Sequence, residues 1–268
     1  MSDRTPTSSG IWLAPVHPDV VWFSGSDALR FLNDLISQEI GDMSPGESRR
    51  SFLLEPQGKL RFLLWVVRDG YRYGLVTEDG RGADLATALG RYRIRVDVEI
   101  AEHDRGAWIV IGGRNGFDVS WAGVERKLVI GERPDLAEGS EDDYERLRVL
   151  AGEPKWGVDV DEGTIPHESG LVPASVDFTK GCFLGQELVA RIDSRGGNTP
   201  RHLRRLRTDG SISGGDVVTA ADEKVGVVTS AGEGVGLAML KRSVSVGDSV
   251  EVAGSRATVE DLPPKTPG

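Results

Sequence analysis

The segment Lys180-Gly-Cys-Phe-Leu-Gly-Gln-Glu-Leu-Val-Ala-Arg191 surrounds the one cysteine of this 268-residue chain. Lys180 stands two residues before Cys182, and the run 186–192 has a composition that favours a helix. The cysteine is therefore expected just before or at a helix N-terminus. A nearby cation and the positive end of a helix both stabilise a thiolate. We interpret Cys182 as a reactive thiol in a functional site.

Other residues of the same segment extend this candidate site. Gly181 and Gly185 permit close backbone approach or unusual dihedral angles. Gln186 and Glu187 add hydrogen-bonding groups near the helix start, and Arg191 lies one helical turn after Glu187 on the same face. The alternative interpretation is that a lone cysteine is an inert, buried, small apolar residue. A cysteine flanked by a lysine, two glycines and a polar cluster fits that alternative poorly.

The composition is acidic and rich in glycine. The chain has 32 Lys and Arg against 42 Asp and Glu, a net charge of −10, which argues against broad binding to nucleic acid. Its 35 glycines are roughly double the usual share and indicate many turns and substantial β structure. No apolar stretch reaches the ~18 residues of a membrane span, and the first residues do not resemble a signal peptide. We expect a cytoplasmic protein.

The counts of cysteine and histidine limit metal binding. One cysteine forms no internal disulfide, and the other candidate ligands are four histidines that are scattered along the chain. A structural zinc site needs four such ligands, and an iron–sulfur cluster usually needs four thiolates. We therefore expect no metal site formed by this chain alone.

The order of elements predicts three parts: a disordered tail over 1–10, an α+β body over 11–199 with two subdomains, and a β-barrel domain over 200–268. In the body, two β-like runs flank the turn Pro56-Gln-Gly-Lys59 and indicate a hairpin. After Pro200, short β-like runs alternate with glycine turns, which is typical of a small barrel or sandwich.

Residues 91–100 show the most regular alternation in the chain. Apolar residues at the even positions alternate with charged residues at the odd ones, which predicts a strand. Its charged face is either simply solvated or, in a sharper interpretation, a row of cations (Arg91, Arg93 and Arg95) that lines a cleft for an anionic ligand. The spacing does not decide between them.

The segment 180–191 resembles the signature of the YgfZ family, folate-binding relatives of the glycine-cleavage T-protein. That family is implicated in maturing or repairing iron–sulfur enzymes and, indirectly, in tRNA modification. Weaker resemblance covers most of the chain, in the stretches 26–35, 52–60, 91–95, 147–154 and 165–168. The resemblance implies a T-protein-like α+β fold that ends in an all-β barrel and encloses a central tetrahydrofolate pocket.

The cofactor implied by this resemblance is tetrahydrofolate, which has a flat pterin ring and an anionic glutamate tail. An aromatic wall such as Trp65 suits the ring, and cations such as Lys180 or Arg191 suit the tail. The expected cofactor-binding residues are Lys180, Gly181, Gln186, Glu187, Arg191, Glu168 and Trp65.

The chain departs from the T-protein pattern at the residues tied to one-carbon chemistry. After the hairpin, Arg61 and Phe62 stand where the aminomethyltransferases have an acidic pair, and Leu150 stands where a folate-contacting glutamate is implied. Neither Arg61 nor Phe62 can accept a proton or stabilise a developing cation on the folate.

Three functional hypotheses follow. The first is a folate-binding accessory factor for iron–sulfur protein assembly or repair, which acts through Cys182 on client proteins or cluster carriers. The alternative is a tetrahydrofolate-dependent aminomethyl- or methyltransferase, so enzymatic activity stays open. The third is an RNA-associated module that uses the basic segment 180–207. We expect a monomer.

Overall fold

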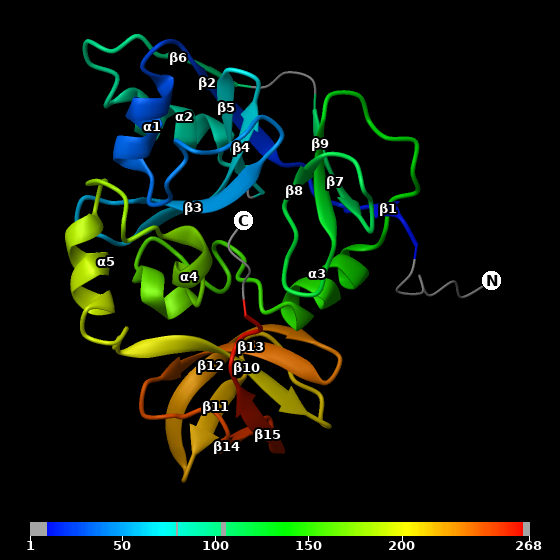
Figure 1. The fold of residues 1–268 in the computed structure, drawn as a ribbon. Helices are drawn as coiled ribbons and strands as arrows, with labels where there is room; N and C mark the ends of the chain where they lie inside the picture. The colour runs from blue at the N-terminus through cyan, green and yellow to red at the C-terminus, as the bar shows by residue number, and fades with distance from the viewer. Residues whose placement is uncertain (1–9, 79, 103–105, 265–268) are drawn as a thin grey trace.

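The computed structural model describes residues 10–78, 80–102 and 106–264 (Figure 1). The expected tail over residues 1–10 lies, apart from Gly10, outside the described residues. Two sheets with their helices form the upper part of the molecule in Figure 1, and a barrel lies below them. In the described part of the chain, no helix is both long enough and apolar enough to cross a bilayer.

The first sheet is antiparallel, with the strand order β3-β4-β5-β2-β6. Its strands are β2 (Asp19–Ser24), β3 (Ser48–Leu54), β4 (Leu60–Asp69), β5 (Arg72–Thr77) and β6 (Glu99–Glu102). The predicted hairpin is present as β3 and β4, which pair with Phe52 opposite Leu63. Because side chains alternate along a strand, β4 contributes Phe62 to one face of the sheet and Trp65 to the other.

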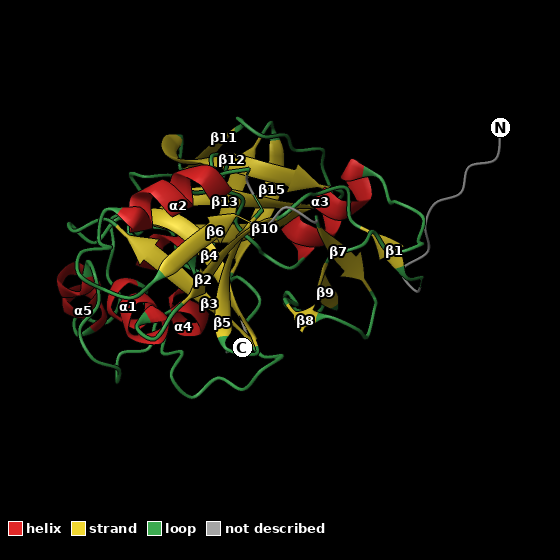
Figure 2. Cartoon of the chain, turned by 90° about the horizontal axis from the view of Figure 1, so that it is seen from above, coloured by secondary structure: helices red, strands yellow, loops and turns green. Residues whose placement is uncertain are grey.

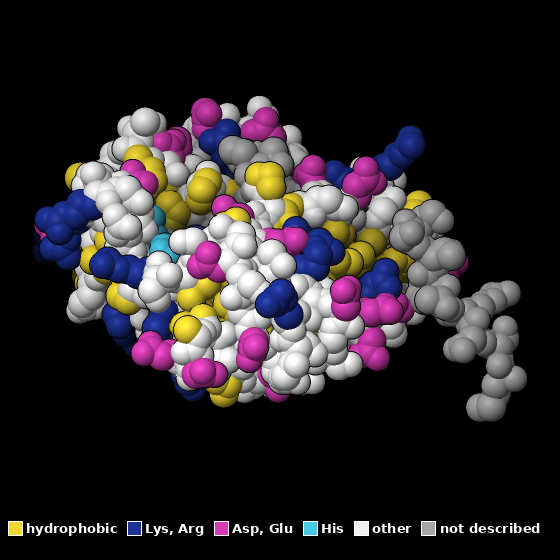
Figure 3. Space-filling view, turned by 90° about the horizontal axis from the view of Figure 1, so that it is seen from below, with side chains coloured by type: hydrophobic (Ala, Val, Ile, Leu, Met, Phe, Trp, Pro, Cys, Tyr) yellow, Lys and Arg dark blue, Asp and Glu magenta, His cyan; other side chains and the backbone are white. Residues whose placement is uncertain are grey.

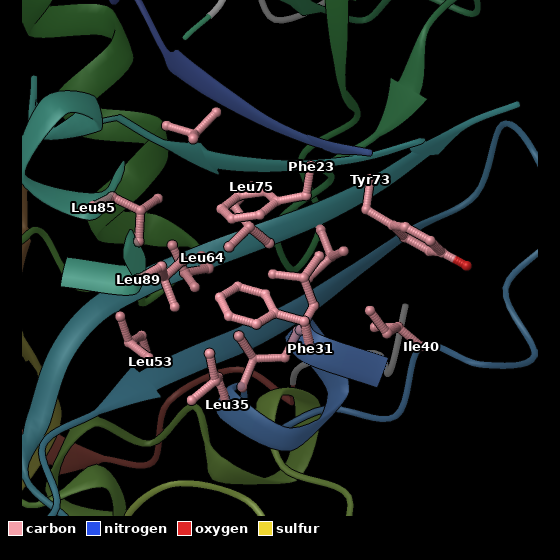
Figure 4. Packing of buried hydrophobic residues seen from close by; sticks show 14 of the residues in the cluster. Phe23, Phe31, Leu35, Ile40, Leu53, Leu64, Tyr73, Leu75, Leu85 and Leu89 are labelled. Atoms are coloured by element: carbon pink, nitrogen blue, oxygen red, sulfur yellow. The ribbon is translucent and has the colours of Figure 1, made fainter. Parts of the chain in front are cut away.

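Helices α1 (Ala28–Leu35) and α2 (Gly82–Gly90) cover one face of this sheet (Figure 2). The buried residues of α1 recur at the spacing of a single helix face, namely Ala28, Phe31, Leu32 and Leu35. They pack against apolar side chains of β2, β4 and β5, among them Phe23, Leu64 and Leu75 (Figure 4). This cluster is the first core of the body.

The second sheet has the order β1-β7-β9-β8, formed by β1 (Trp12–Leu13), β7 (Ala107–Ile111), β8 (Phe117–Asp118) and β9 (Arg126–Ile130). Its apolar side chains join the opposite face of the first sheet in a second core, which includes Trp22, Trp65, Ile109 and Leu128. Helix α3 (Glu141–Leu150) contributes Tyr144 to this core and then leads toward the barrel.

Three short helices connect the body to the barrel: η1 (Pro166–Ser169), α4 (Val172–Ser175) and α5 (Gln186–Asp193). The closed barrel has the order β10-β13-β12-β11-β14-β15. Its strands are β10 (Arg201–Thr208), β11 (Val217–Ala220), β12 (Glu223–Gly232), β13 (Val235–Lys241), β14 (Ser249–Val252) and β15 (Ser255–Glu260). An α+β body followed by an all-β barrel is the predicted fold class.

The predicted strand over 91–100 is wrong for most of its length. Residues 91–98 form a connection after α2, and only Glu99–Glu102 pair as β6. Arg95 has a φ of 55°, which breaks an extended run. The Asp97 carboxylate accepts hydrogen bonds from the backbone N–H and the hydroxyl of Ser26, which bends the chain toward the start of α1. These local contacts override the alternating pattern and leave Ile94 71% exposed.

Candidate functional site

A cavity of about 270 Å³ lies between the first sheet, the second core and α3. Strands β3, β4 and β5 form one side of it, α3 contributes the side chains of Tyr144, Glu145 and Arg148, and the segment 153–156 forms a further wall. Trp65, expected from the sequence as a pocket wall, lines this cavity. The other expected cofactor-binding residues belong to other parts of the structure.

Aromatic rings form much of the wall, and guanidinium groups cover them. The lining includes Trp65, Trp121, Tyr144 and Trp156. An arginine guanidinium lies over each of the indole rings, at 4.4 Å for Arg50 on Trp65, 3.6 Å for Arg126 on Trp121 and 4.6 Å for Arg81 on Trp156. Such cation–π pairs hold the rings in place, so the aromatic wall is preorganised.

The charged groups of the cavity wall occur in ion pairs. Arg50 pairs with Glu153, and Glu145 pairs with Arg148 at 2.8 Å and with Lys155 at 3.0 Å. Although burial alone would raise the pKa of Glu145, the hydrogen bonds from these two cations lower it. The charged part of the wall is thus balanced, which suits a neutral heteroaromatic ring better than a free anion.

Glu78 belongs to a buried cluster at the edge of the cavity. Its carboxylate accepts hydrogen bonds from Arg126 Nη2 at 2.7 and 2.8 Å and from the Tyr144 hydroxyl at 2.8 Å. Burial alone would lower the pKa of the fully buried Arg126, but Glu78 raises it above its ordinary value. Burial raises the pKa of Tyr144 well above its usual value of 10. Arg126 therefore stays cationic and Tyr144 stays protonated.

Lys180 is a half-buried side chain that caps a helix. Its Nζ donates to the backbone oxygens of Asn33, Ile36 and Gln38 at 2.8 to 2.9 Å and to Asn33 Oδ1 at 3.2 Å. These oxygens stand at the C-terminus of α1, where a cation satisfies orphan carbonyl groups. Burial lowers the pKa of Lys180 to about 8, and the Glu39 carboxylate limits the shift. The ammonium group that we expected beside the thiol or the cofactor is directed at α1.

Gly185 is required by close packing. It has a φ of +78° at the N-cap of α5, and a Cβ there would lie 2.5 Å from the carbonyl oxygen of Glu55. Gly58, in the turn of the β3–β4 hairpin, has a φ of +80°, and its Cβ would lie 2.5 Å from Leu188 Cβ. A Cβ at Gly181, in contrast, meets nothing within 4 Å among the described residues.

Cys182 is exposed in the loop before α5, which begins at Gln186. Glu187 in the first turn and Arg191 in the last turn of α5 are also exposed, and Gln186 is partly buried. The thiol is thus accessible to other molecules. Among the described residues, no group of three or more His, Cys, Asp or Glu side chains could hold a metal ion.

Glu168 is a buried structural residue. Its Oε2 accepts a hydrogen bond from the backbone N–H of Ile165, which caps η1, and its Oε1 accepts one from Arg201 Nε at 3.2 Å. The carboxylate thereby joins η1 to the first strand of the barrel. It is not among the residues that line the described cavity.

The basic segment 180–207 is paired with acidic residues along β10. Arg204 bonds Asp261 at 2.9 Å, and Arg205 and Arg207 both bond Glu260. Acidic and basic side chains are interspersed over the face in Figure 3. These pairings leave less positive charge for RNA phosphates than the sequence suggests.

Sequence reasoning missed most of the cavity wall. Arg50 stands in the first hairpin strand, Glu78 follows β5, and Glu153 follows α3. Distant segments supply these residues, so no short motif connects them.

Comparison with known proteins finds similarity to iron–sulfur cluster assembly factors. Residues 201–265 match the family model described as CAF17, C-terminal beta-barrel domain. The human mitochondrial iron–sulfur cluster assembly factor IBA57 is 37% identical over 200 residues, which cover 72% of this chain and 50% of the human protein. A Cryptococcus neoformans IBA57 homologue is 36% identical over 115 residues, 40% of this chain and 29% of that protein. These assembly factors are homologues of the chain. The chain spans half or less of the length of these two relatives.

The structure resembles the glycine cleavage system aminomethyltransferase T from Bartonella henselae, with a TM-score of 0.84 over 95% of this chain and 86% of that one. The identity is 18%, so this likeness concerns the fold, and it confirms the predicted T-protein-like fold with a C-terminal barrel. The expected cytoplasmic location is contradicted, because the IBA57 relatives are mitochondrial proteins.

The cavity has features that fit the pterin ring of a folate. Its wall combines flat aromatic side chains with balanced charge, and Arg50 Nη2 is buried there with no hydrogen-bond partner among the described residues. The T-protein positions for one-carbon chemistry do not fit that role. Arg61 pairs with Glu55 at 3.0 Å, and Phe62 is buried in the first core.

Proposed function

We propose that this chain is an accessory factor in iron–sulfur cluster protein assembly or repair that binds tetrahydrofolate in the central cavity and acts through Cys182. The observation that carries the proposal is the homology to IBA57 assembly factors at 37% identity over 200 residues. The aromatic, charge-balanced cavity and the exposed thiol support its two finer parts.

The cavity and the Cys182 loop would have separate roles, which follow from the chemistry of their side chains. Trp65, Trp121 and Trp156 would stack on or flank the pterin, while Arg50 and Glu153 would bond its polar edge. Tetrahydrofolate supplies a reduced ring that can carry one-carbon units. Cys182 would contribute one thiolate to a cluster shared with a partner. Alternatively, its thiolate would attack a disulfide of a cluster carrier, forming a mixed disulfide and releasing the carrier's second cysteine as a thiolate. Client iron–sulfur proteins and carriers are therefore the proposed partners.

The alternative of a folate-dependent aminomethyltransferase has less support. Such an enzyme needs a group that accepts a proton or stabilises positive charge at the folate nitrogen. Arg61 is itself a cation held by Glu55, and Phe62 is apolar and buried. Turnover of a methylamine donor to methylene-tetrahydrofolate by the purified protein would favour the enzyme over the accessory factor.

The test is complementation of cells that lack this chain. The wild-type chain should restore the activity of iron–sulfur enzymes, and Cys182→Ser should not, although the variant folds and binds folate as the wild type does. If the Cys182→Ser variant restores full activity, the thiol is not required for the function. Failure of the wild type to restore activity would contradict the role in assembly.

A further inference from the structure

Arg50 lies in the cavity wall, and one nitrogen of its guanidinium makes no hydrogen bond to the described residues. The residue is 5% exposed, and its Nη1 donates to Glu153 Oε1. Its Nη2 makes no hydrogen bond to any described residue. A buried N–H without an acceptor costs free energy, so an acceptor that a ligand brings to this atom would recover that cost.

The surroundings of Arg50 fix its orientation. The guanidinium lies 4.4 Å over the ring of Trp65, and the salt bridge to Glu153 joins side chains that are each 7% exposed. Two independent contacts therefore hold the planar donor group, and little conformational entropy is lost when a ligand binds it.

The pair of Arg50 and Glu153 presents opposite hydrogen-bonding roles side by side. The guanidinium can only donate, and the ionised carboxylate can only accept and accommodates several bonds. The two charges cancel, so the pair favours a neutral polar edge over a free carboxylate. The matching edge is a ring carbonyl next to a ring N–H, as in the lactam of a 4-oxopterin.

We propose that Arg50, with Glu153, is the specificity-determining residue of the cavity and selects heteroaromatic ligands that carry a ring carbonyl beside a ring N–H. This inference rests on the proposed binding of folate. Arg50 Nη2 donates to the carbonyl oxygen, and Glu153 accepts from the adjacent N–H. The ring itself lies against the aromatic wall that includes Trp65.

The test compares two ligands that differ at this edge. Folic acid carries a 4-oxo group, and aminopterin carries a 4-amino group, which would meet Arg50 donor to donor. Affinities are measured through tryptophan fluorescence at pH 7, where both pteridine rings are mainly uncharged and the lactam N–H of folic acid is retained. The wild type should bind folic acid about tenfold or more tightly than aminopterin, as expected for a hydrogen bond with a charged donor.

Variants separate recognition from folding. Arg50→Met and Arg50→Lys should each bring the affinity ratio of the two ligands close to one, because neither keeps the planar second donor. Arg49→Met is the matched control, since Arg49 precedes Arg50 on β3 and pairs with Asp42. It should leave the ratio unchanged.

The outcomes distinguish this inference from the proposed function. An unchanged ratio in both Arg50 variants, or a wild type that does not discriminate, would overturn the inference while folate binding stands. A wild type that binds neither ligand nor tetrahydrofolate would overturn both. If the Arg50 variants lose the preference for folic acid while the wild type and Arg49→Met keep it, both the inference and the proposed binding of folate are supported.

Discussion

Gly58 and Gly185 pack backbone against backbone, so that a Cβ on Gly185 would lie 3.1 Å from the Cα of Gly58. The first belongs to the turn of the β3–β4 hairpin, and the second is the N-cap of α5. This contact fixes the Cys182 loop to the sheet that forms one side of the cavity. The second glycine of the 180–191 segment is thus a structural requirement.

Substitution of the two glycines of this segment should give different results. Gly185→Ala places a Cβ 2.5 Å from the Glu55 carbonyl oxygen at a positive φ, so we expect a loss of about 2 to 4 kcal/mol in unfolding free energy. Gly181→Ala meets open space and should change it by less than about 0.5 kcal/mol. Urea unfolding followed by circular dichroism measures both. Equal effects would contradict the packing argument.

Lys180→Met should destabilise the protein without reducing affinity for folate. The variant leaves the carbonyl groups at the end of α1 without their donor, which costs about 2 to 3 kcal/mol. Urea unfolding and a folate titration of the same preparation test the two halves of this statement. A large fall in affinity for folate with an unchanged free energy of unfolding would indicate that Lys180 contacts the cofactor.

The fold was more accessible to sequence reasoning than the site. The hairpin and the barrel follow from short-range signals, such as the Pro56–Lys59 turn and the glycine turns after Pro200. The alternation over 91–100 misled because Asp97 and Arg95 impose a local bend. The cavity escaped prediction because Arg50 and Glu153 meet only through tertiary structure.

Arg148 should be a stabilising connection between α3 and the barrel. Its buried guanidinium bonds Asp159 at 2.7 Å and the hydroxyl of Ser230 in β12 at 2.7 Å. Arg148→Met leaves the Asp159 carboxylate buried without its cation, so we expect a loss of about 3 to 5 kcal/mol. The double variant Arg148→Met, Asp159→Asn should recover part of that loss in urea unfolding. No recovery would mean that the pair is not coupled.

The buried His167 should make the protein less stable in acid. Burial lowers its pKa below 6.5, and Asp193 limits the shift. As the pH falls below 6.5, the unfolded chain takes up the proton first, so stability decreases as the pH falls from 6.5 toward the lower pKa of the folded state. His167→Phe should flatten this part of the profile of unfolding free energy against pH. Burial also lowers the pKa of His202, so a residual slope is expected. An unaltered slope in His167→Phe would exclude His167 as a source.

Cys182 should react in the folded protein. The thiol is exposed, and the chain has no other cysteine, so a chromogenic disulfide reagent reports this site alone. We expect one equivalent to react at the same rate with and without denaturant to within about tenfold. Protection by a much larger factor would show a buried thiol and remove it from contact with partners.

Binding of tetrahydrofolate in the cavity is measured by a calorimetric titration of the wild type, Lys180→Met and Val16→Trp. Val16 is a half-buried residue of the cavity wall, where an indole would fill space that the ligand needs. We predict saturable one-to-one binding to the wild type and Lys180→Met, and loss of binding in a folded Val16→Trp. Absence of binding to the wild type, or undiminished binding to Val16→Trp, would contradict this prediction.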